Sequence, residues 1–446
     1  MDRFARPFLF ALCLSSVAAA APRTGPSVAP PDEVDAALLQ RIDAVAAAQA
    51  DAGLLSGVVL VARGDRILLQ RGYGFTSWEL RAPATPATRF GIGSITKVMT
   101  ATVVDLLVAE GRLDLDAPAS RYLGSFPAGP SGGAVTVRHL VDHRAGVPHR
   151  VTSPVEETQS LHPSDIVERV RARGLVFEPG TQELYSSAGF SSLARVIERI
   201  EGKPFDAVLR DRIFRPASMA TAIDETGQQL MPARALPYRL GATAGALVVA
   251  NAPYKHLGFL TGAGSVYAAA EDLLRFARAL RTGAFGAAGK ARVDGSGGQV
   301  WRSWYGRTDG YEASVDIMPA TDVTFVFLSN LRSAATWQVR DHVKNLLTGR
   351  DAAGIRLPPT PLVAPFESAD SVLGRYGDAA DPLLITAVDG HLFRDGNEIY
   401  PIAGERYYLP ASGSVMRFRR TGDGVVDAIV TVAPWDGTER VALRLP

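Results

Sequence analysis

The sequence predicts an α+β protein in which helices flank an antiparallel sheet, followed by a small all-β domain. Helical stretches occupy the middle of the first 350 residues, whereas strand-like runs lie near both ends of that region. Segments that are distant in the sequence must therefore pair in one sheet. A proline-rich stretch then precedes short strand-like runs separated by Gly, Asp and Pro. We place the first domain at 33–350, a linker at 351–366 and the β domain at 367–446.

The N-terminal residues 1–21 have the pattern of a secretory signal peptide. Arg3 and Arg6 precede an apolar run at 7–17, and small residues at 18–21 suit a cleavage site. The apolar run is too short to span a bilayer comfortably. We therefore expect a periplasmic or secreted protein with no membrane span after cleavage. The alternative is a hydrophobic anchor that stays uncleaved.

Cysteine content and charge exclude several classes of function. Cys13 is the only cysteine, so a cleaved chain has no thiol for catalysis, zinc-thiolate binding or an iron–sulfur cluster. The formal net charge is +1, with 47 basic and 46 acidic residues, which gives no reason to expect a nucleic-acid partner. We expect neither a metal nor an organic cofactor.

The individual elements follow from apolar periodicity and turn residues. Residues 35–52 have helical spacing, and strands at 57–62 and 66–72 predict a hairpin. A third prediction is a helix that begins at Ser94 and ends before Gly111. The remaining predictions, in chain order, are helices at 190–200 and 271–280, a strand at 323–328, a helix at 339–347, and strands at 383–388, 399–402, 406–409, 415–419, 428–432 and 441–445.

The strongest chemical signal is Ser94 at a helix start with Lys97 three residues later. Positions i and i+3 share one helix face, so the hydroxyl and the amine can meet. A lysine can take the serine proton if its pKa is lowered, and Ser-x-x-Lys is a signature of penicillin-recognising enzymes. Only five of the 47 basic residues are lysines, which makes Lys97 more informative. The alternative is a helix-capping serine beside an exposed lysine.

Five segments follow one another along the chain, namely FGIGSITK at 90–97, TVRHLVDHRAGVPH at 136–149, the stretch at 177–198, the stretch at 262–280 and the closing strand pair at 311–330. Together they resemble the serine β-lactamase-related family. This family includes class C β-lactamases, D-Ala-D-Ala carboxypeptidases, D-aminopeptidases and family VIII carboxylesterases. The resemblance implies a β-lactamase/transpeptidase-like fold, with a helical lobe inserted and the active site between lobe and sheet.

The resemblance assigns a role to Tyr185, which matches the tyrosine of the family's second motif. Its phenol would share a proton with Lys97 and pass it to the leaving group. The motif normally reads Tyr-x-Asn, but here Ser187 stands in place of the asparagine. Serine is shorter and lacks the amide's paired donor and acceptor, so recognition of an amide in the substrate is weakened.

The third motif of the family resembles Trp304-Tyr305-Gly306 in this chain. Glycine lets a substrate approach the strand closely, and Arg307 would supply the second oxyanion N–H beside that of Ser94. Trp304 stands where relatives carry Lys or His, and we expect it to form an apolar stacking wall; the alternative is ordinary aromatic packing. This favours neutral esters, although the Arg307 guanidinium could reach a carboxylate.

The sequence therefore predicts a serine hydrolase that forms an acyl-enzyme on Ser94, with small-molecule esters as the leading substrates. One alternative is a D-Ala-D-Ala carboxypeptidase, D-aminopeptidase or weak β-lactamase acting on a D-amino-acid peptide or β-lactam-like substrate. Another is a non-catalytic relative that binds peptidoglycan. His139 and His143 have the spacing of a zinc pair, but no third ligand stands out.

Overall fold

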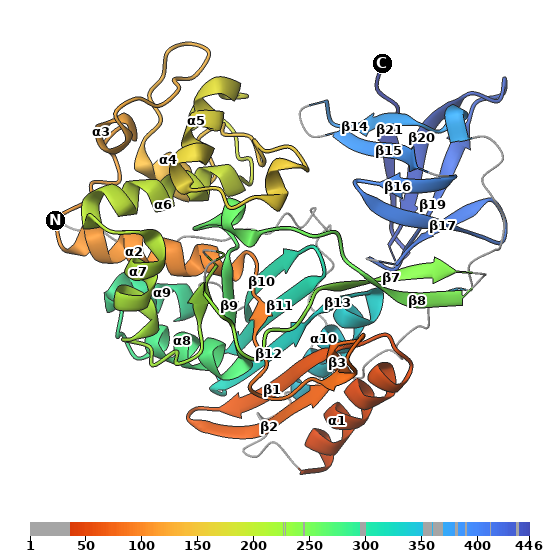
Figure 1. Cartoon of the computed structure of the whole chain (residues 1–446), viewed down its shortest axis with the longest axis horizontal. Helices are drawn as coiled ribbons and strands as arrows, with labels where there is room; N and C mark the ends of the chain where they lie inside the picture. Colours follow the sequence, from red (N-terminus) through yellow and green to blue (C-terminus); the bar gives the residue numbers. More distant parts are fainter. Residues whose placement is uncertain are drawn as a thin grey trace, which may run out of the picture.

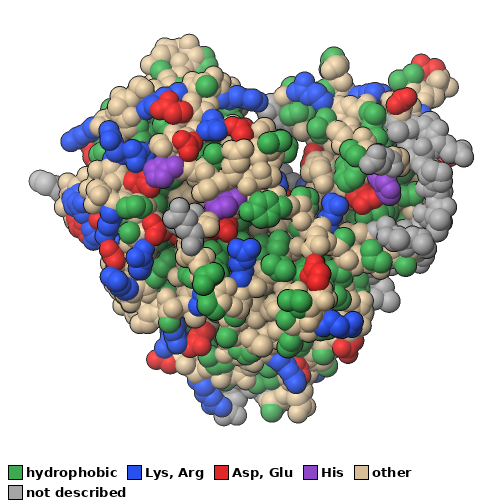
Figure 2. Space-filling view, viewed as in Figure 1, with side chains coloured by type: hydrophobic (Ala, Val, Ile, Leu, Met, Phe, Trp, Pro, Cys, Tyr) green, Lys and Arg blue, Asp and Glu red, His purple; other side chains and the backbone are tan. Residues whose placement is uncertain are grey.

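The computed structural model describes residues 36–350 and 369–446, together with residue 359. Single positions or short stretches within these ranges are excepted, namely 226, 228, 244–245, 295–299, 380–381, 389, 411 and 434–436. The predicted signal peptide at 1–21 lies outside the described residues, as does the linker at 351–366 apart from residue 359. Among the described residues, no helix is both long and apolar enough to cross a bilayer. Basic and acidic side chains are intermixed over the face shown in Figure 2.

The first domain is built around a five-stranded antiparallel sheet with the order β10-β11-β12-β1-β2 (Figure 1). The pairing of Val59 with Phe327 joins strands from the two ends of the domain, as the sequence predicts. The predicted hairpin is also confirmed. The strands are β1 (Gly57–Arg63), β2 (Arg66–Tyr73), β10 (Arg302–Thr308), β11 (Tyr311–Met318) and β12 (Val323–Ser329).

Helices cover both faces of this sheet, which explains why β11 and β12 are buried along their whole lengths. Alternate residues of β1 point to opposite faces. Val58 and Leu60 belong to the core that contains helix α2, whereas Val59 and Val61 pack with α1 and α10. The covering helices are α1 (Ala36–Asp51) and α10 (Ala334–Leu347) on one face, and α2 (Ile95–Ala109) and α8 (Ala270–Arg281) on the other.

A helical lobe lies beside α2 (Figure 1). Its longest member, α6, has one apolar face that joins the main core through Phe190, Leu193 and Ile197. The helices of the lobe and its surroundings are α3 (Ser120–Leu123), α4 (Val137–Val141), η1 (Glu156–Thr158), α5 (Pro163–Arg173), α6 (Ser187–Glu201), α7 (Phe205–Leu209), η2 (Arg210–Phe214), η3 (Leu257–Leu260) and α9 (Gly286–Asp294).

Three small sheets connect these parts. The sheet β5-β9-β6 holds the chain just before α2, and the sheet β13-β7-β8 extends toward the C-terminal domain (Figure 1). Their strands, with those of the β3-β4 pair, are β3 (Phe75–Ser77), β4 (Ala82–Pro83), β5 (Phe90–Gly91), β6 (Ile223–Asp224), β7 (Tyr238–Thr243), β8 (Ala246–Asn251), β9 (Val266–Ala268) and β13 (Leu331–Arg332).

The C-terminal domain is a closed eight-stranded barrel in which each strand pairs with its sequence neighbours. A bridge between Tyr376 and Arg444 joins the first strand to the last. The all-β prediction is confirmed, but two short strands, β14 and β16, were not predicted. The elements are η4 (Ala369–Ser371), β14 (Gly374–Gly377), β15 (Pro382–Val388), β16 (His391–Arg394), β17 (Asn397–Ile402), β18 (Arg406–Leu409), β19 (Ser414–Arg420), β20 (Val426–Val432) and β21 (Glu439–Leu443).

Candidate active site

Ser94 lies in a tight turn between strand β5 and helix α2. The Ile92 amide donates a hydrogen bond to the Val266 carbonyl at 2.9 Å. Gly93 then adopts a left-handed conformation, with φ at +50°. Ser94 precedes the helix, but its side chain makes no capping hydrogen bond. The hydroxyl is therefore directed to other partners, and the capping alternative is wrong.

Lys97 is buried beneath Ser94, with only 1% of the residue exposed. Its Nζ donates to the Ala263 carbonyl at 2.8 Å and lies 3.2 Å from the Ser94 Oγ and 3.3 Å from the Ser187 Oγ. Burial lowers the pKa of Lys97, although the Tyr185 phenol opposes this shift. The alternative of an exposed helix lysine is therefore wrong, because this amine has the surroundings that a base requires.

Tyr185 approaches Ser94 from the helical lobe, two residues before α6. Its phenol donates a hydrogen bond to the Ser94 Oγ at 2.7 Å. The Nζ of Lys97 lies over the Tyr185 ring, 4.8 Å from the centroid. The structure thus brings together four predicted site residues from distant parts of the sequence. They are Ser94, Lys97, Tyr185 and Ser187, and 93 positions separate the first from the last.

Gly306 and Arg307 bring strand β10 against the Ser94 turn. A Cβ on Gly306 would lie 1.8 Å from the Ile92 carbonyl oxygen and 2.9 Å from the Ser94 nitrogen. A Cβ on Gly93 would lie 2.5 Å from the Arg307 nitrogen. Only glycine permits this contact between two backbones.

The direction of the Arg307 N–H follows from the register of the hairpin. Thr308 and Tyr311 face each other across a two-residue turn, and such a flanking pair exchanges hydrogen bonds. The next pair, Arg307 with Glu312, therefore turns its N–H groups outward. Because β10 is the edge strand of the sheet, the Arg307 N–H faces the Ser94 turn, where a carbonyl oxygen undergoing attack can be held.

The comparison with known families agrees with this geometry. The model of the family described as Beta-lactamase matches residues 42–348, which is more than half of the chain. This chain belongs to the Beta-lactamase family. Its members are serine hydrolases, and a serine activated by a buried base is what such hydrolysis requires.

Two curated relatives and one solved structure illustrate the breadth of the Beta-lactamase family. Esterase EstB of Burkholderia gladioli is 28% identical over 278 residues, which cover 55% of this chain and 71% of EstB. PbpX of Bacillus subtilis (strain 168) is 29% identical over 229 residues, or 51% of this chain and 55% of PbpX. The crystal structure of SurE has a TM-score of 0.60 at 21% identity, and the match covers 92% of this chain and 99% of SurE.

The alignment with SurE confirms the β-lactamase/transpeptidase-like fold predicted for the first domain. Because the match covers 92% of the chain, it reaches into the C-terminal barrel as well. At 21% identity the likeness concerns the fold alone.

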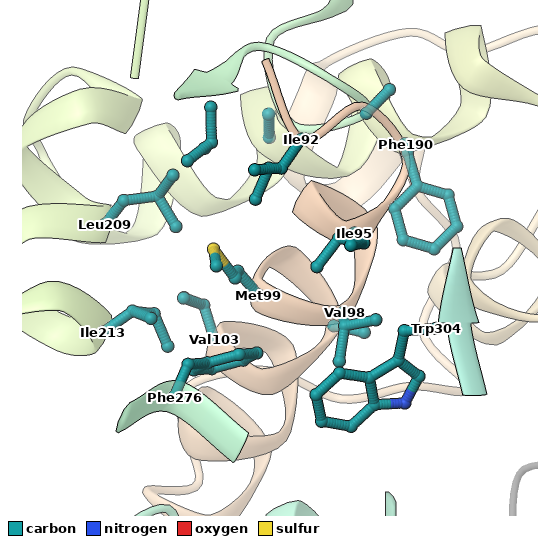
Figure 3. Close-up of a cluster of buried hydrophobic side chains, with 14 of the residues drawn as sticks. Ile92, Ile95, Val98, Met99, Val103, Phe190, Leu209, Ile213, Phe276 and Trp304 are labelled. Carbon is teal, nitrogen blue, oxygen red and sulfur yellow. The ribbon is translucent and has the colours of Figure 1, made fainter. Parts of the chain in front are cut away.

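Trp304 does not line the candidate site as expected. The residue is only 6% exposed, and its ring packs 5.9 Å from that of Phe276. Figure 3 shows it beside Val98 in the core below α2. On β10, Trp304 and Gly306 share one face of the strand, and Trp304 fills the space between α2 and α8. An apolar wall toward the substrate is therefore not formed by this side chain.

The remaining predicted residue, Arg307, is exposed. Side chains alternate along a strand, so its guanidinium leaves β10 on the face opposite Gly306. Glu312 lies directly across from it on β11, and the Arg307 charge limits the rise that burial causes in the pKa of Glu312. Only the backbone N–H of Arg307 faces the Ser94 turn.

Two histidines that the sequence analysis did not assign to the site flank Tyr185. The rings of His143 and His149 lie 4.5 Å and 5.5 Å from the Tyr185 ring. The His143 Nδ1 accepts a hydrogen bond from the Ser186 amide at 3.0 Å. Burial and then Lys97 lower the pKa of His143 to about 3 and that of His149 to about 4. Both imidazoles stay neutral at physiological pH and buttress the tyrosine.

The signal that could have identified these histidines was their place in the family-like segment at 136–149. Helical spacing drew attention to His139 and His143 instead, as a zinc pair without a third ligand, and packing or helix-end hydrogen bonds were the favoured interpretation. In the structure the His139 Nδ1 accepts from the Thr136 amide at 3.3 Å, while His143 points to the Tyr185 loop. Among the described residues, no group of three His, Cys, Asp or Glu side chains could hold a metal ion.

Proposed function

We propose that this protein is a serine hydrolase that forms an acyl-enzyme on Ser94, with carboxylic esters as its substrates. The observation that carries the proposal is the contact of the Ser94 hydroxyl with a buried amine and with a phenol that can relay protons. Lys97 Nζ lies 3.2 Å away and the Tyr185 phenol 2.7 Å away. Burial lowers the pKa of Lys97, which favours its action as the base.

In the first step the Ser94 proton passes to Lys97, directly or through the Tyr185 phenol. The Ser94 Oγ then attacks the ester carbonyl carbon, and the carbonyl electron pair moves onto oxygen. The N–H groups of Ser94 and Arg307 stabilise the resulting oxyanion. When the oxyanion collapses, the bond to the alkoxide breaks and Tyr185 supplies the proton that the leaving group needs, while Lys97 returns the Ser94 proton to Tyr185. Water repeats the sequence on the acyl-enzyme, which releases the acid and restores Ser94.

The preference for esters rests on Ser187 and on the relatives. The Ser187 Oγ is committed to Lys97 at 3.3 Å, and serine is too short to offer a substrate amide both a donor and an acceptor. Esterase EstB, which matches 55% of this chain, supports the same direction. Trp304 gives no support, because it lies in the core.

A second candidate is hydrolysis of a carboxylate-bearing D-peptide or β-lactam. The observation in its favour is Arg150, whose side chain is 46% exposed. Its charge contributes to the lowered pKa of Lys97, which places a cation beside the site. A guanidinium of this kind can bind a substrate carboxylate.

A fluorophosphonate probe tests the proposal, because it reacts covalently with an activated serine. Wild-type protein should be labelled, Ser94→Ala should not, and Ser131→Ala should be labelled normally because Ser131 is exposed and distant in sequence from the Ser94 turn. Absence of labelling in the wild type would support a non-catalytic, peptidoglycan-binding relative.

Assays of the wild type and of Ser94→Ala with a p-nitrophenyl ester, nitrocefin and a D-Ala-D-Ala peptide then separate the two candidates. Ester turnover that disappears in Ser94→Ala supports the esterase. Turnover of nitrocefin or the peptide without ester turnover would instead identify the second candidate.

A further inference from the structure

The turn between β10 and β11 determines where the Arg307 N–H lies. Because β10 is an edge strand, only β11 pairs with it, and the turn residues Asp309 and Gly310 fix its end. Gly310 has φ at +82°, and a Cβ there would lie 2.8 Å from the Tyr238 nitrogen. The turn thus rests directly on strand β7 and has no free space on that side.

Asp309 is held by cations on two sides. Its carboxylate lies 2.8 Å from the Lys255 Nζ and 3.8 Å from the Arg332 Nη1. Burial alone would raise the pKa of Asp309, but the charges of Lys255 and Arg332 outweigh burial and lower it. The turn therefore carries a fixed negative charge between two cations.

Arg332 connects this turn to the C-terminal barrel. Its side chain is only 13% exposed, and its Nη1 donates to the Asn397 Oδ1 at 2.8 Å. Asn397 is the first residue of β17 in the barrel. A second contact lies close by, since the Ala334 amide donates to the Pro410 carbonyl at 2.9 Å. The barrel is therefore hydrogen-bonded to the first domain through the two residues that flank Ser333.

Lys255 connects the same turn to the helical lobe. Its Nζ also pairs with Glu157, which is only 3% exposed. The second oxygen of Glu157 accepts from the Arg150 Nη1 at 3.1 Å. The turn is thus held between the lobe and the barrel by one continuous chain of charged and polar contacts.

We propose that the barrel positions the oxyanion strand, through the contacts from Asn397 to Arg332 and from Arg332 to Asp309. This proposal rests on the proposed function, because it assigns a remote role in the Ser94 reaction. The three side chains are positioning residues and touch no substrate. Their contacts are partly buried, with the Arg332 and Asp309 side chains 13% and 27% exposed, so removal of one partner weakens the compensation of the remaining charge and displaces the turn. A displaced turn moves the Arg307 N–H, whose value to catalysis depends on its distance from the oxyanion.

The test is a double-mutant cycle between Asn397→Ala in the barrel and Asp309→Asn in the turn. The readout is the rate at which a phosphonate probe reacts with Ser94, because this rate depends on the oxyanion N–H groups. We expect Asp309→Asn to slow the reaction about tenfold and Asn397→Ala about threefold, since complete loss of one oxyanion donor costs roughly 100-fold or more. The double variant should be no slower than Asp309→Asn alone.

Two controls separate positioning from general damage. Arg417→Ala removes an exposed pair with Glu439 at 3.6 Å elsewhere on the barrel, and it should leave the rate unchanged. Asn397→Asp keeps the side-chain size but competes with Asp309 for Arg332, so it should slow the reaction while the melting temperature is maintained. Ester KM should change less than kcat for every slowed variant.

A wild-type rate in both Asn397 variants, or independent multiplication of the two effects in the double variant, would overturn the inference. Failure of the proposed function has a different signature, because the wild-type protein itself would then not react with the probe.

Discussion

Lys97 has one property that arginine cannot supply, namely an amine whose pKa burial can lower enough for it to act as a base. The side chain is 1% exposed, and burial lowers its pKa. Lys97→Arg keeps a long basic side chain and the helix, but a guanidinium does not act as a base near neutral pH. We expect kcat/KM for a p-nitrophenyl ester to fall by about 100-fold or more. Lys203→Arg, in a partly exposed pair with Asp211, should retain full activity.

The histidines beside Tyr185 predict how stability responds to acid. The pKa values of His143 and His149 in the folded chain are about 3 and about 4, below the value near 6.5 expected for unfolded histidine. Between these values the unfolded chain binds more protons than the folded chain, so the contribution of these two histidines to stability falls as the pH decreases from about 6.5 to 4.

Urea unfolding at pH 7 and at pH 4.5 measures this effect. His143→Gln should reduce the loss between the two pH values, because glutamine does not titrate. His391→Gln, at an exposed barrel position, is the matched control. An unchanged pH dependence in His143→Gln would show that this imidazole is not the group responsible.

At the scale of single elements, strand β10 has two roles: Gly306 lies against the Ser94 turn, and Trp304 packs in the core. Gly306→Ala would place a Cβ 1.8 Å from the Ile92 carbonyl oxygen, and a backbone carbonyl cannot move away as a flexible side chain can. We expect ester hydrolysis to fall by 100-fold or more, on the scale of losing an oxyanion donor. Gly422→Ala, which has no atom within 4 Å of its Cβ, should be neutral. Activity near the wild-type level in Gly306→Ala would contradict the placement of β10.

Trp304 has the opposite role on the same strand. Because its ring packs on Phe276 in the core, Trp304→Ala should lower the free energy of unfolding by roughly 3–5 kcal/mol. Trp304→Phe should lose less stability and keep the KM for a p-nitrophenyl ester within about twofold of the wild type. A large rise in KM without loss of stability would restore the substrate-wall interpretation.

The contrast between Lys97 and Trp304 shows which parts of the site could be predicted from the sequence. The spacing of Ser94 and Lys97 is set by one helix, so their contact could be predicted from helical geometry. The position of Trp304 depends on which face of β10 meets the helices, and that requires the register of a strand pair. The histidines were missed because their partner, the Tyr185 loop, comes from a different segment. The strands β14 and β16 were missed because each has only four residues.

At the scale of the whole molecule, two buried carboxyl groups lower stability as the pH rises toward neutrality. Burial raises the pKa of Glu312 and of Asp224 to about 7. Unfolded carboxyls ionise near pH 4, so between roughly pH 4.5 and 7 the folded chain holds more protons than the unfolded chain. The contribution of these two carboxyl groups to stability therefore falls as the pH rises through this interval.

Glu312→Gln should remove part of this dependence of stability on pH. Arg332, Arg307 and Arg340 are the cations that face Glu312 and limit the rise of its pKa. At pH 8 the variant should be more stable than the wild type by on the order of 3 kcal/mol, while at pH 5 the two should be similar. Chemical unfolding at both pH values measures this difference, with the exposed Glu439→Gln as the control. Equal stabilities at pH 8 would assign the slope to other groups.

The pairing of β1 with β12 also determines the order in which the molecule can form. Val59 meets Phe327, so a newly made β1 stays without its central partner until nearly the whole first domain has been synthesised. The barrel has no such delay, because each of its strands pairs with the next and the first meets the last. Local pairing closes faster than pairing across a long loop. In refolding experiments, pulse-labelled hydrogen exchange should therefore show protected amides in the barrel before those of β1.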